Sequence, residues 1–251
     1  MVAAVGELHA GSADGGAEES DATGHLVRNV AELVDRIPAD PKPADTFTPA
    51  ELQKVLKHIE GDRYAIAWQL ALTGLRRGEV AGLRWSDIDL DARTLQISST
   101  RLRFGKHVVE DTPKSRPGRR ILPIPDHLAA TLRAARAVQA ADRLALGEHY
   151  EASGYVVVDE AGAALSPHAL TSRWARMLTA AGARHIRFHD ARHTCGTLMH
   201  LQDVPTAVIS AWLGHASKAF TMATYEHSQP EALNTAAQSF ARVVTNRDNS
   251  G

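Results

Sequence analysis

The 251-residue sequence contains a single cysteine, Cys195. One cysteine excludes an intramolecular disulfide framework and any zinc site built from cysteines alone, and it is consistent with a reducing compartment. No uncharged apolar stretch approaches the ~20 residues that a membrane helix needs, so no membrane partner is expected. No lysine or arginine precedes Arg28, and the N-terminus therefore does not have the pattern of a secretory signal.

Net charge is also nearly absent, at −1, but it is unevenly distributed. Residues 1–46 hold 9 acidic and 3 basic side chains, whereas residues 47–251 hold 20 acidic and 25 basic ones. Residues 101–120 carry seven basic side chains against two acidic ones. The seven are Arg101, Arg103, Lys106, Lys114, Arg116, Arg119 and Arg120. Such a patch indicates a polyanionic partner, and a solvated charged face is an alternative of about equal weight.

Composition divides the chain into a tail, a linker and a main domain. Residues 1–23 are rich in Gly, Ala, Ser and acidic residues, which predicts a flexible tail. Residues 24–37 are compatible with a short helix, and residues 38–49 hold four prolines, which is typical of a linker. We therefore expect a short helix and linker over 24–45 and a main domain over 46–251.

Helices dominate the main domain. Thr48 and Glu51 form a capping box with a proline between them, and apolar residues follow at helical spacing as far as Gly61. Proline, glycine and capping residues delimit the later candidates in the same way. Further helices are expected over about 62–73, around 79–83, and over 126–146, 167–181, 189–202, 205–213 and 230–244.

Period-2 patterns interrupt the helices after Thr94. Short strands are expected over 94–99, 106–111 and 119–124, joined by turns rich in Gly, Pro and Ser. Residues 154–160 are a further strand or an extended segment. The fold class is therefore mainly α (α+β), with a small three-stranded antiparallel sheet near the start of the domain.

Two segments supply the first candidate functional residues. Arg76 follows Gly74 at the start of a helix, where free N–H groups also favour an anion, and Glu79 lies on the same helical face. A structural Arg–Glu pair is the alternative interpretation. Lys114 lies near the tip between two expected strands, from where a lysine could reach a site and donate a proton. Taken alone, Lys114 is more typical of a solvated turn.

A histidine-rich helix supplies the next candidates. His189, Arg192 and His193 are spaced i, i+3 and i+4 and therefore share one helical face. Arginine and histidine near a helix start suit a phosphate, because arginine is a bidentate donor and histidine a single one. A zinc hydrolase is a competing interpretation of the two histidines. The acid that follows His189 is aspartate, however, and Arg192 would place a fixed positive charge beside the metal, so we expect no metal site.

The last candidates are His215, which follows Gly214 at an expected helix end, and Tyr225, ten residues later. A helix C-cap and a half-buried core aromatic are the structural alternatives. The ordered set resembles the tyrosine recombinases, the family of phage integrases and related site-specific DNA recombinases. The resemblance covers about residues 46–240 and implies a helical catalytic domain of that type. The positions that match the functional residues of the family are Arg76, Glu79, Lys114, His189, Arg192, His215 and Tyr225.

The resemblance implies that a phosphodiester of double-stranded DNA is transferred to the Tyr225 hydroxyl, giving a 3′-phosphotyrosine and a free 5′-hydroxyl. Arg76 and Arg192 would clamp the phosphate, with hydrogen bonds from His189 and His215. Lys114 would protonate the leaving 5′-oxygen, and His189 is a candidate base for Tyr225. Since the arginines supply the positive charge, neither a metal, nor ATP, nor another cofactor is expected.

Supporting roles follow from the same resemblance. Glu79 would orient Arg76, and His193 would pack or hydrogen-bond behind His189. The remaining basic side chains of the 101–120 patch would contact DNA: Arg101, Arg103, Lys106, Arg116, Arg119 and Arg120. The 230–244 helix would either pack on its own domain or dock on a neighbouring protomer. We expect a monomer in free solution and a homo-oligomer on DNA, tetrameric in the synapse. The expected location is the cytoplasm, where a bacterial or phage-encoded protein would act on host DNA.

Relatives of this kind usually carry a helical core-binding domain ahead of the catalytic domain. Only about 45 residues precede Thr46, so residues 24–45 are interpreted as a remnant of that domain. Three explanations of the short N-terminal region stay open: a shortened chain, a prophage relic and a naturally short recombinase. A catalytic domain alone should bind DNA weakly and recombine poorly. Two functional alternatives share the fold: a type IB-like relaxing activity and a non-catalytic DNA-binding relic.

Overall fold

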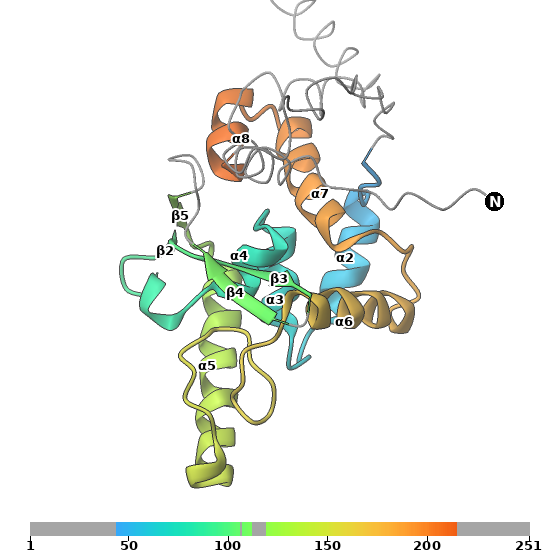
Figure 1. The fold of residues 1–251 in the computed structure, drawn as a ribbon. Helices are drawn as coiled ribbons and strands as arrows, with labels where there is room; N and C mark the ends of the chain where they lie inside the picture. The colour runs from blue at the N-terminus through green and yellow to red at the C-terminus, as the bar shows by residue number, and fades with distance from the viewer. Residues whose placement is uncertain (1–43, 106, 112–118, 215–251) are drawn as a thin grey trace, which may run out of the picture. The chain divides into compact units, whose positions relative to one another are not determined.

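The computed structural model describes residues 44–105, 107–111 and 119–214, all of them within one compact unit, Pro43–Gly251. The fold is mainly helical with two small antiparallel sheets (Figure 1). The helices are α2 (Pro49–His58), α3 (Ala65–Leu72), α4 (Arg77–Gly82), α5 (Asp126–Leu146), α6 (Pro167–Ala180), α7 (Phe188–Leu201) and α8 (Thr206–Leu213), with 3-10 turns η2 (Trp85–Asp87) and η4 (Gly147–His149).

The helix boundaries follow from local capping chemistry, as predicted. Thr48 and Glu51 form the expected capping box, in which the Glu51 carboxylate accepts from the Thr48 N–H at 2.8 Å. Ser166 caps α6 by accepting from the Ala169 N–H at 3.1 Å. The expected helix over 126–146 matches α5, and those over 167–181, 189–202 and 205–213 match α6, α7 and α8 to within a residue or so at each end. The expected helices over 24–37 and 230–244 lie outside the described residues.

The strands are β1 (Ile88–Asp89), β2 (Thr94–Ile97), β3 (Thr100–Phe104), β4 (His107–Asp111) and β5 (Arg120–Pro123). A three-stranded antiparallel sheet is confirmed, in the order β1-β2-β5, but the prediction of its members was wrong. The predicted 106–111 strand does not join it. Instead β4 pairs with β3, in a hairpin that turns at Gly105, where the positive φ of 58° suits glycine.

Residues 154–160 do not form a regular strand. They make isolated bridges only, Arg84 with Tyr155 and Val158 with Ala164, so the extended alternative is the correct one. Helix α5 projects away from the rest of the fold, and α7 and α8 lie at the opposite end (Figure 1). None of the described helices is long and apolar enough to cross a membrane.

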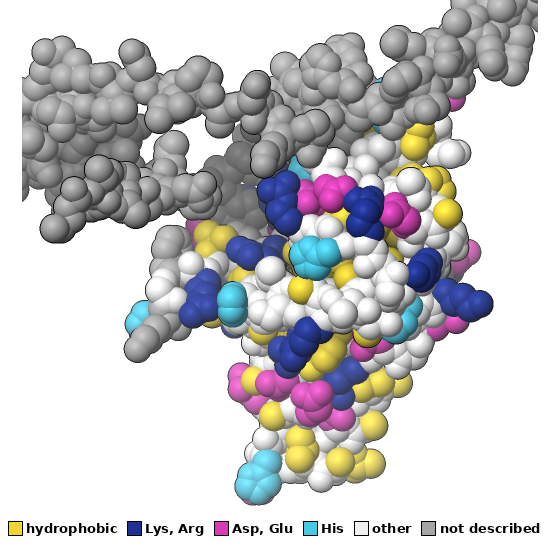
Figure 2. Space-filling view, turned by 90° about the vertical axis from the view of Figure 1, so that its right-hand side faces the viewer, with side chains coloured by type: hydrophobic (Ala, Val, Ile, Leu, Met, Phe, Trp, Pro, Cys, Tyr) yellow, Lys and Arg dark blue, Asp and Glu magenta, His cyan; other side chains and the backbone are white. Residues whose placement is uncertain are grey.

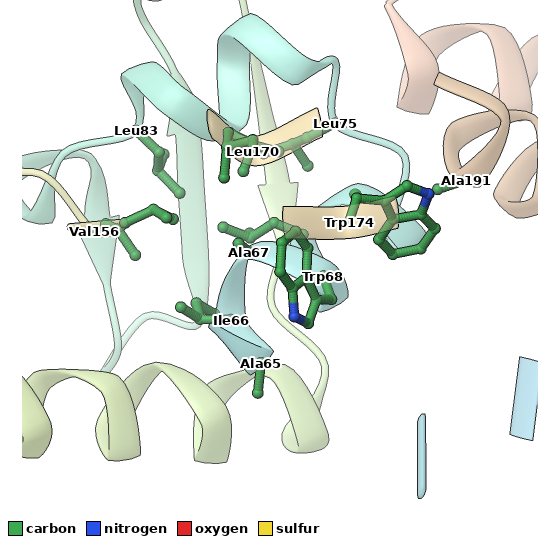
Figure 3. Packing of buried hydrophobic residues seen from close by; sticks show 14 of the residues in the cluster. Ala65, Ile66, Ala67, Trp68, Leu75, Leu83, Val156, Leu170, Trp174 and Ala191 are labelled. Carbon is green, nitrogen blue, oxygen red and sulfur yellow. The ribbon is translucent and has the colours of Figure 1, made fainter. Parts of the chain in front are cut away.

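An aromatic cluster at the centre of the core fixes the helices that carry the site. Trp68 of α3 and Trp174 of α6 lie side by side with ring centroids 5.7 Å apart, next to Ala191 of α7 (Figure 3). Phe188, the first residue of α7, packs edge-on against Trp174 at 5.7 Å. Trp174 also donates to the Ile186 carbonyl at 2.9 Å. These contacts fix the position of the first turn of α7, which carries His189 and Arg192.

The face on the side of α2 and α6 carries basic and acidic side chains interspersed with one another (Figure 2). A mixed surface of this kind creates no strong field of one sign. A candidate anion site must therefore be sought where arginines gather without neighbouring carboxylates.

Candidate active site

Arg76 lies at the N-terminus of α4, directly after a turn that requires glycine. Gly74 has φ +103°, and a Cβ there would approach Leu213 Cδ2 to 2.7 Å. The Glu79 carboxylate accepts from the Arg76 N–H at 2.8 Å and from Arg76 Nη1 at 2.8 Å. Arg76 Nη2 donates to the Gly214 carbonyl at 2.6 Å. The predicted Arg–Glu face therefore exists, and it is anchored to the far end of α8.

Arg192 enters the same region from α7. Its side chain is buried, with 2% exposure. Nη1 donates to the Gly74 carbonyl at 2.6 Å, and Nη2 donates to the Leu213 carbonyl. Arg76 and Arg192 are 116 positions apart in sequence, yet they bind adjacent carbonyls at the end of α8. The structure thus brings together the two arginines that the sequence analysis paired.

His189 and His193 stack along one face of α7, as their spacing predicts. Their rings are 4.9 Å apart in an edge-to-face arrangement. Partial burial lowers the pKa of His189 to about 4, and the charges of His193, Arg192 and Arg76 act in the same direction. Burial also lowers the pKa of His193. Both imidazoles are therefore neutral at neutral pH, which leaves each ring a hydrogen-bond acceptor.

Asp190 lies between the two histidines in the sequence and pairs with Arg187. It is buried at 1% exposure and accepts from Arg187 Nε and Nη2, both at 2.9 Å. Among the described residues, no group of three or more His, Cys, Asp or Glu side chains could hold a metal ion. His193 Nδ1 is buried without a hydrogen-bond partner in the described part of the chain. The donor set offers no support for the zinc alternative.

Glu79 is a buried carboxylate shared by two arginines. It is 3% exposed, and Arg120 binds both of its oxygens, Nη1 to Oε1 and Nη2 to Oε2, each at 3.0 Å. Burial opposes ionisation, but the hydrogen bonds and charges of Arg120 and Arg76 outweigh it and hold the pKa of Glu79 below its ordinary value. Glu79 is therefore ionised, and its contact with Arg76 is the geometry expected of an orienting residue.

Arg120 departs from its expected place on a DNA-contacting surface. Its side chain is 7% exposed, and besides Glu79 it binds the Trp212 carbonyl through Nε at 2.7 Å. The strand explains the difference, because Arg120 shares one face of β5 with the buried Leu122. The residues of β5, Arg-Ile-Leu-Pro, do not alternate polar with apolar side chains, and Ile121 is exposed, so no clear sequence signal indicated that Arg120 faces inward.

The other described members of the basic patch differ among themselves. Arg101 is partly buried, donates to the Leu165 carbonyl at 3.0 Å and lies 4.8 Å over the Tyr155 ring. Arg103 is exposed and donates from Nε to the Gly105 carbonyl at 2.8 Å, within its own hairpin. Arg119 is exposed as well. Among the members of the basic patch that the structure describes, only Arg103 and Arg119 are exposed cations of the kind that the sequence analysis expected.

An open groove connects the hairpin to the candidate site. Its lining includes Arg76, Arg77, Arg101, Arg103 and the neutral His189, and no carboxylate is among its lining residues in the described structure. The sequence analysis did not single out Arg77, although it directly follows Arg76 in the printed sequence. A groove lined by arginines favours a polyanion such as a nucleic-acid backbone.

Cys195 packs behind this arrangement as a core residue. Burial raises the pKa of its thiol to about 12, and Sγ donates to the Thr73 carbonyl at 3.2 Å. The same carbonyl accepts from Trp212 Nε1 at 2.8 Å. Cys195 is therefore a neutral thiol that joins α7 to the Gly74 turn. The remaining candidates lie outside the described residues: Lys106, Lys114, Arg116, His215 and Tyr225.

Comparisons with known proteins agree on one family. Residues 45–232 match the model of the phage integrase family. A tyrosine recombinase XerC-like protein of Caldanaerobacter subterraneus is 30% identical over 211 residues, which cover 77% of this chain and 53% of the relative. The integrase of Mycobacterium phage L5 is 29% identical over 191 residues, which cover 75% of this chain and 50% of the relative. The chain thus spans about half the length of these relatives.

The fold comparison gives the same result. A solved structure of the Tn1549 transposon integrase in complex with transposon right end DNA superposes with a TM-score of 0.67. It is 20% identical in sequence, and the match covers 87% of this chain and 74% of that one. At this identity the match shows the fold, a helical domain with a small antiparallel sheet.

Proposed function

The chain belongs to the phage integrase family, and on that premise we propose that residues 46–251 are the catalytic domain of a site-specific DNA recombinase. The domain cleaves and rejoins DNA through a 3′-phosphotyrosine on Tyr225. The observation that carries the proposal is the meeting of Arg76 and Arg192 on adjacent carbonyls at the end of α8, next to the groove that holds His189.

The arginine pair fits the charge that phosphoryl transfer develops. The transition state carries negative charge on the nonbridging oxygens, and a guanidinium matches two of them without ever losing its proton. Arg76 is 38% exposed and lines the groove, so it is positioned to meet a phosphate. Arg192 is 2% exposed, so its contact with the phosphate requires a local movement of the chain around it when DNA binds.

The proposed reaction balances without an external cofactor. The Tyr225 oxygen attacks phosphorus, the bond from phosphorus to the 5′-oxygen breaks, and Lys114 gives that oxygen a proton. His189, being neutral, accepts the phenolic proton, and His215 donates to the phosphate. Attack by the 5′-hydroxyl of another strand then reverses the steps. The phosphotyrosine conserves the bond energy, so neither ATP nor a metal ion is required.

DNA and a second protomer are the proposed partners. The groove arginines and Arg119 would bind backbone phosphates, which positions the duplex without reading its sequence. We further propose a monomer in solution and a tetramer on paired sites, with residues 230–244 docking between protomers.

Covalent trapping on genomic DNA tests the proposal. The protein is incubated with sheared bacterial DNA in EDTA, quenched with SDS, and the ends of the protein-linked fragments are sequenced, with Tyr225→Phe in parallel. Adducts that require Tyr225 and cluster at one sequence are expected. Tyr225-dependent adducts at scattered positions would favour the relaxing activity. Binding without any adduct, even after a core-binding region from a relative is supplied, would favour a non-catalytic relic.

A further inference from the structure

The C-terminal end of α8 is held by three arginines from three different elements. Arg120 of β5 binds the Trp212 carbonyl, Arg192 of α7 binds the Leu213 carbonyl, and Arg76 at the start of α4 binds the Gly214 carbonyl. These three carbonyls are consecutive. The last carbonyls of a helix have no partner within the helix and carry the negative end of its dipole, so cations stabilise them.

Arg120 shares the carboxylate of Glu79 with Arg76, but it alone of the three arginines binds both carboxylate oxygens through its guanidinium in the contacts of the described residues. Both of its Nη groups bind the carboxylate of Glu79, at 3.0 Å each, while its Nε reaches α8. The side chain of Arg120 therefore joins β5, α4 and α8. The three residues at this junction, Arg120, Glu79 and Trp212, are buried or half-buried. A planar guanidinium is the side chain that can make a bidentate carboxylate contact and a third, separate contact at the same time.

Glu79 couples Arg120 to Arg76. Because Arg120 occupies both carboxylate oxygens, the carboxylate is fixed in the plane in which Oε1 meets Arg76 Nη1 at 2.8 Å. Arg76 thereby commits one N–H of Nη1 and one of Nη2, and its Nε–H and second Nη hydrogens have no acceptor among the described residues. Those are the donors that a phosphate would use.

We infer that Arg120 is a positioning residue for the reaction: through Glu79 and the Trp212 carbonyl it fixes the Arg76 guanidinium and the end of α8. The inference rests on the proposed function for its catalytic consequence. In the sequence, His215, the next proposed phosphate ligand, follows Gly214 directly. In this proposal Arg120 acts through Glu79 and the Trp212 carbonyl and not by contact with DNA or the reacting atoms.

The test separates positioning from phosphate binding. Arg120→Gln, Arg120→Lys and Glu79→Gln are compared with Arg93→Gln, a matched control whose guanidinium pairs with Asp126 on the surface. Single-turnover adduct formation at saturating DNA is expected to fall about 10- to 100-fold in the Arg120 variants, because small displacements of catalytic groups cost rates of that order. The control should keep the wild-type rate. Lysine should not rescue, because it cannot make the bidentate contact.

Salt dependence and amide exchange give the decisive readouts. The slope of log Kd against log salt should stay unchanged in Arg120→Lys and Arg120→Gln, whereas a lost phosphate contact would reduce it by about 1. In the DNA-free protein, amides at 211–214 should exchange faster in both variants, and those of α5 should not. Wild-type rates of adduct formation, or unchanged exchange at 211–214 in Arg120→Lys, would overturn the inference. Absence of wild-type adducts would contradict the proposed function, and the exchange readout would still test the contact.

Discussion

At the scale of single residues, the site is built from ionisable groups whose burial is compensated. Glu79 is ionised because two arginines bind it. Arg192 is buried, and its guanidinium donates hydrogen bonds to two main-chain carbonyls. His189 is instead kept neutral, since partial burial and neighbouring charges disfavour the imidazolium. Each group thus holds one protonation state at neutral pH, which is what a preorganised electrostatic site requires.

Replacing Glu79 by glutamine should lower stability by roughly 3 kcal/mol, because breaking a buried ion pair leaves uncompensated charge. Urea denaturation with tryptophan fluorescence measures the change. The matched substitution Glu160→Gln removes an exposed carboxylate 3.6 Å from Arg63 and should cost less than about 1 kcal/mol. Equal losses in the two variants would contradict the role given to Glu79.

His189 should make stability depend on pH on the acidic side. Its pKa is about 4 in the folded chain against an ordinary 6.5, so between these values the unfolded chain binds a proton that the folded chain does not. The free energy of unfolding should therefore fall as the pH drops from about 6.5 to 4. His189→Gln should weaken that fall, measured by denaturation at pH 7 and pH 5. An identical fall in variant and wild type would refute the assignment.

At the scale of elements, the Gly74 turn and the end of α8 are one packed unit. Gly74 has a positive φ, and its α-carbon lies against Leu213. Gly61 also has a positive φ, of 78°, but nothing lies within 4 Å of its would-be Cβ. Comparing alanine substitutions at the two glycines therefore separates the conformational part of the stability loss from the part that is due to packing.

Gly74→Ala should destabilise the protein more than Gly61→Ala. Both variants pay the conformational cost of about 1 kcal/mol for a left-handed residue, and Gly74→Ala adds about 1–3 kcal/mol of overpacking against Leu213. Thermal and urea unfolding of the two variants measure the difference. A Gly61→Ala loss as large as that of Gly74→Ala would contradict the close packing of the turn on α8.

At the scale of the whole molecule, local sequence signals predicted the helices. The pairing of the strands was harder to predict, because it depends on residues that are distant in the sequence. The capping box of α2, the Ser166 cap of α6 and Pro125 before α5 located the starts of these helices, because such signals lie within a few residues of a helix end. The partner of β4 was predicted wrongly because β3, the strand with which it pairs, was not predicted. Residues 100–104 alternate Leu102 with two arginines, a strand pattern that the abundant charge concealed.

The candidate site shows the same division. The pair Arg76 and Glu79 was predictable because both residues lie on one turn of helix. The three arginines on consecutive carbonyls of α8 were not, since they come from elements separated by up to 116 positions and meet only in the packed fold. The inward direction of Arg120 was not predictable either, because the strand alternates in burial but not in residue type, with Ile121 exposed and Leu122 buried.

The groove arginines should determine how DNA affinity depends on salt. Removing one phosphate contact should reduce the slope of log Kd against log salt by about 1, so Arg103→Gln should show that reduction on a duplex of arbitrary sequence. Arg93→Gln, away from the groove, should leave the slope unchanged. An unchanged slope in Arg103→Gln would contradict the proposal that the β3–β4 hairpin contacts DNA.

The central claim is that Tyr225 forms a covalent bond to DNA. The most direct measurement is mass spectrometry of the SDS-trapped complex after nuclease and trypsin digestion, carried out in EDTA. The account predicts a nucleotide 3′-phosphate attached to Tyr225 in the peptide spanning residues 219–242, and no adduct with Tyr225→Phe. Attachment to any other residue, or an adduct that survives in Tyr225→Phe, would contradict it.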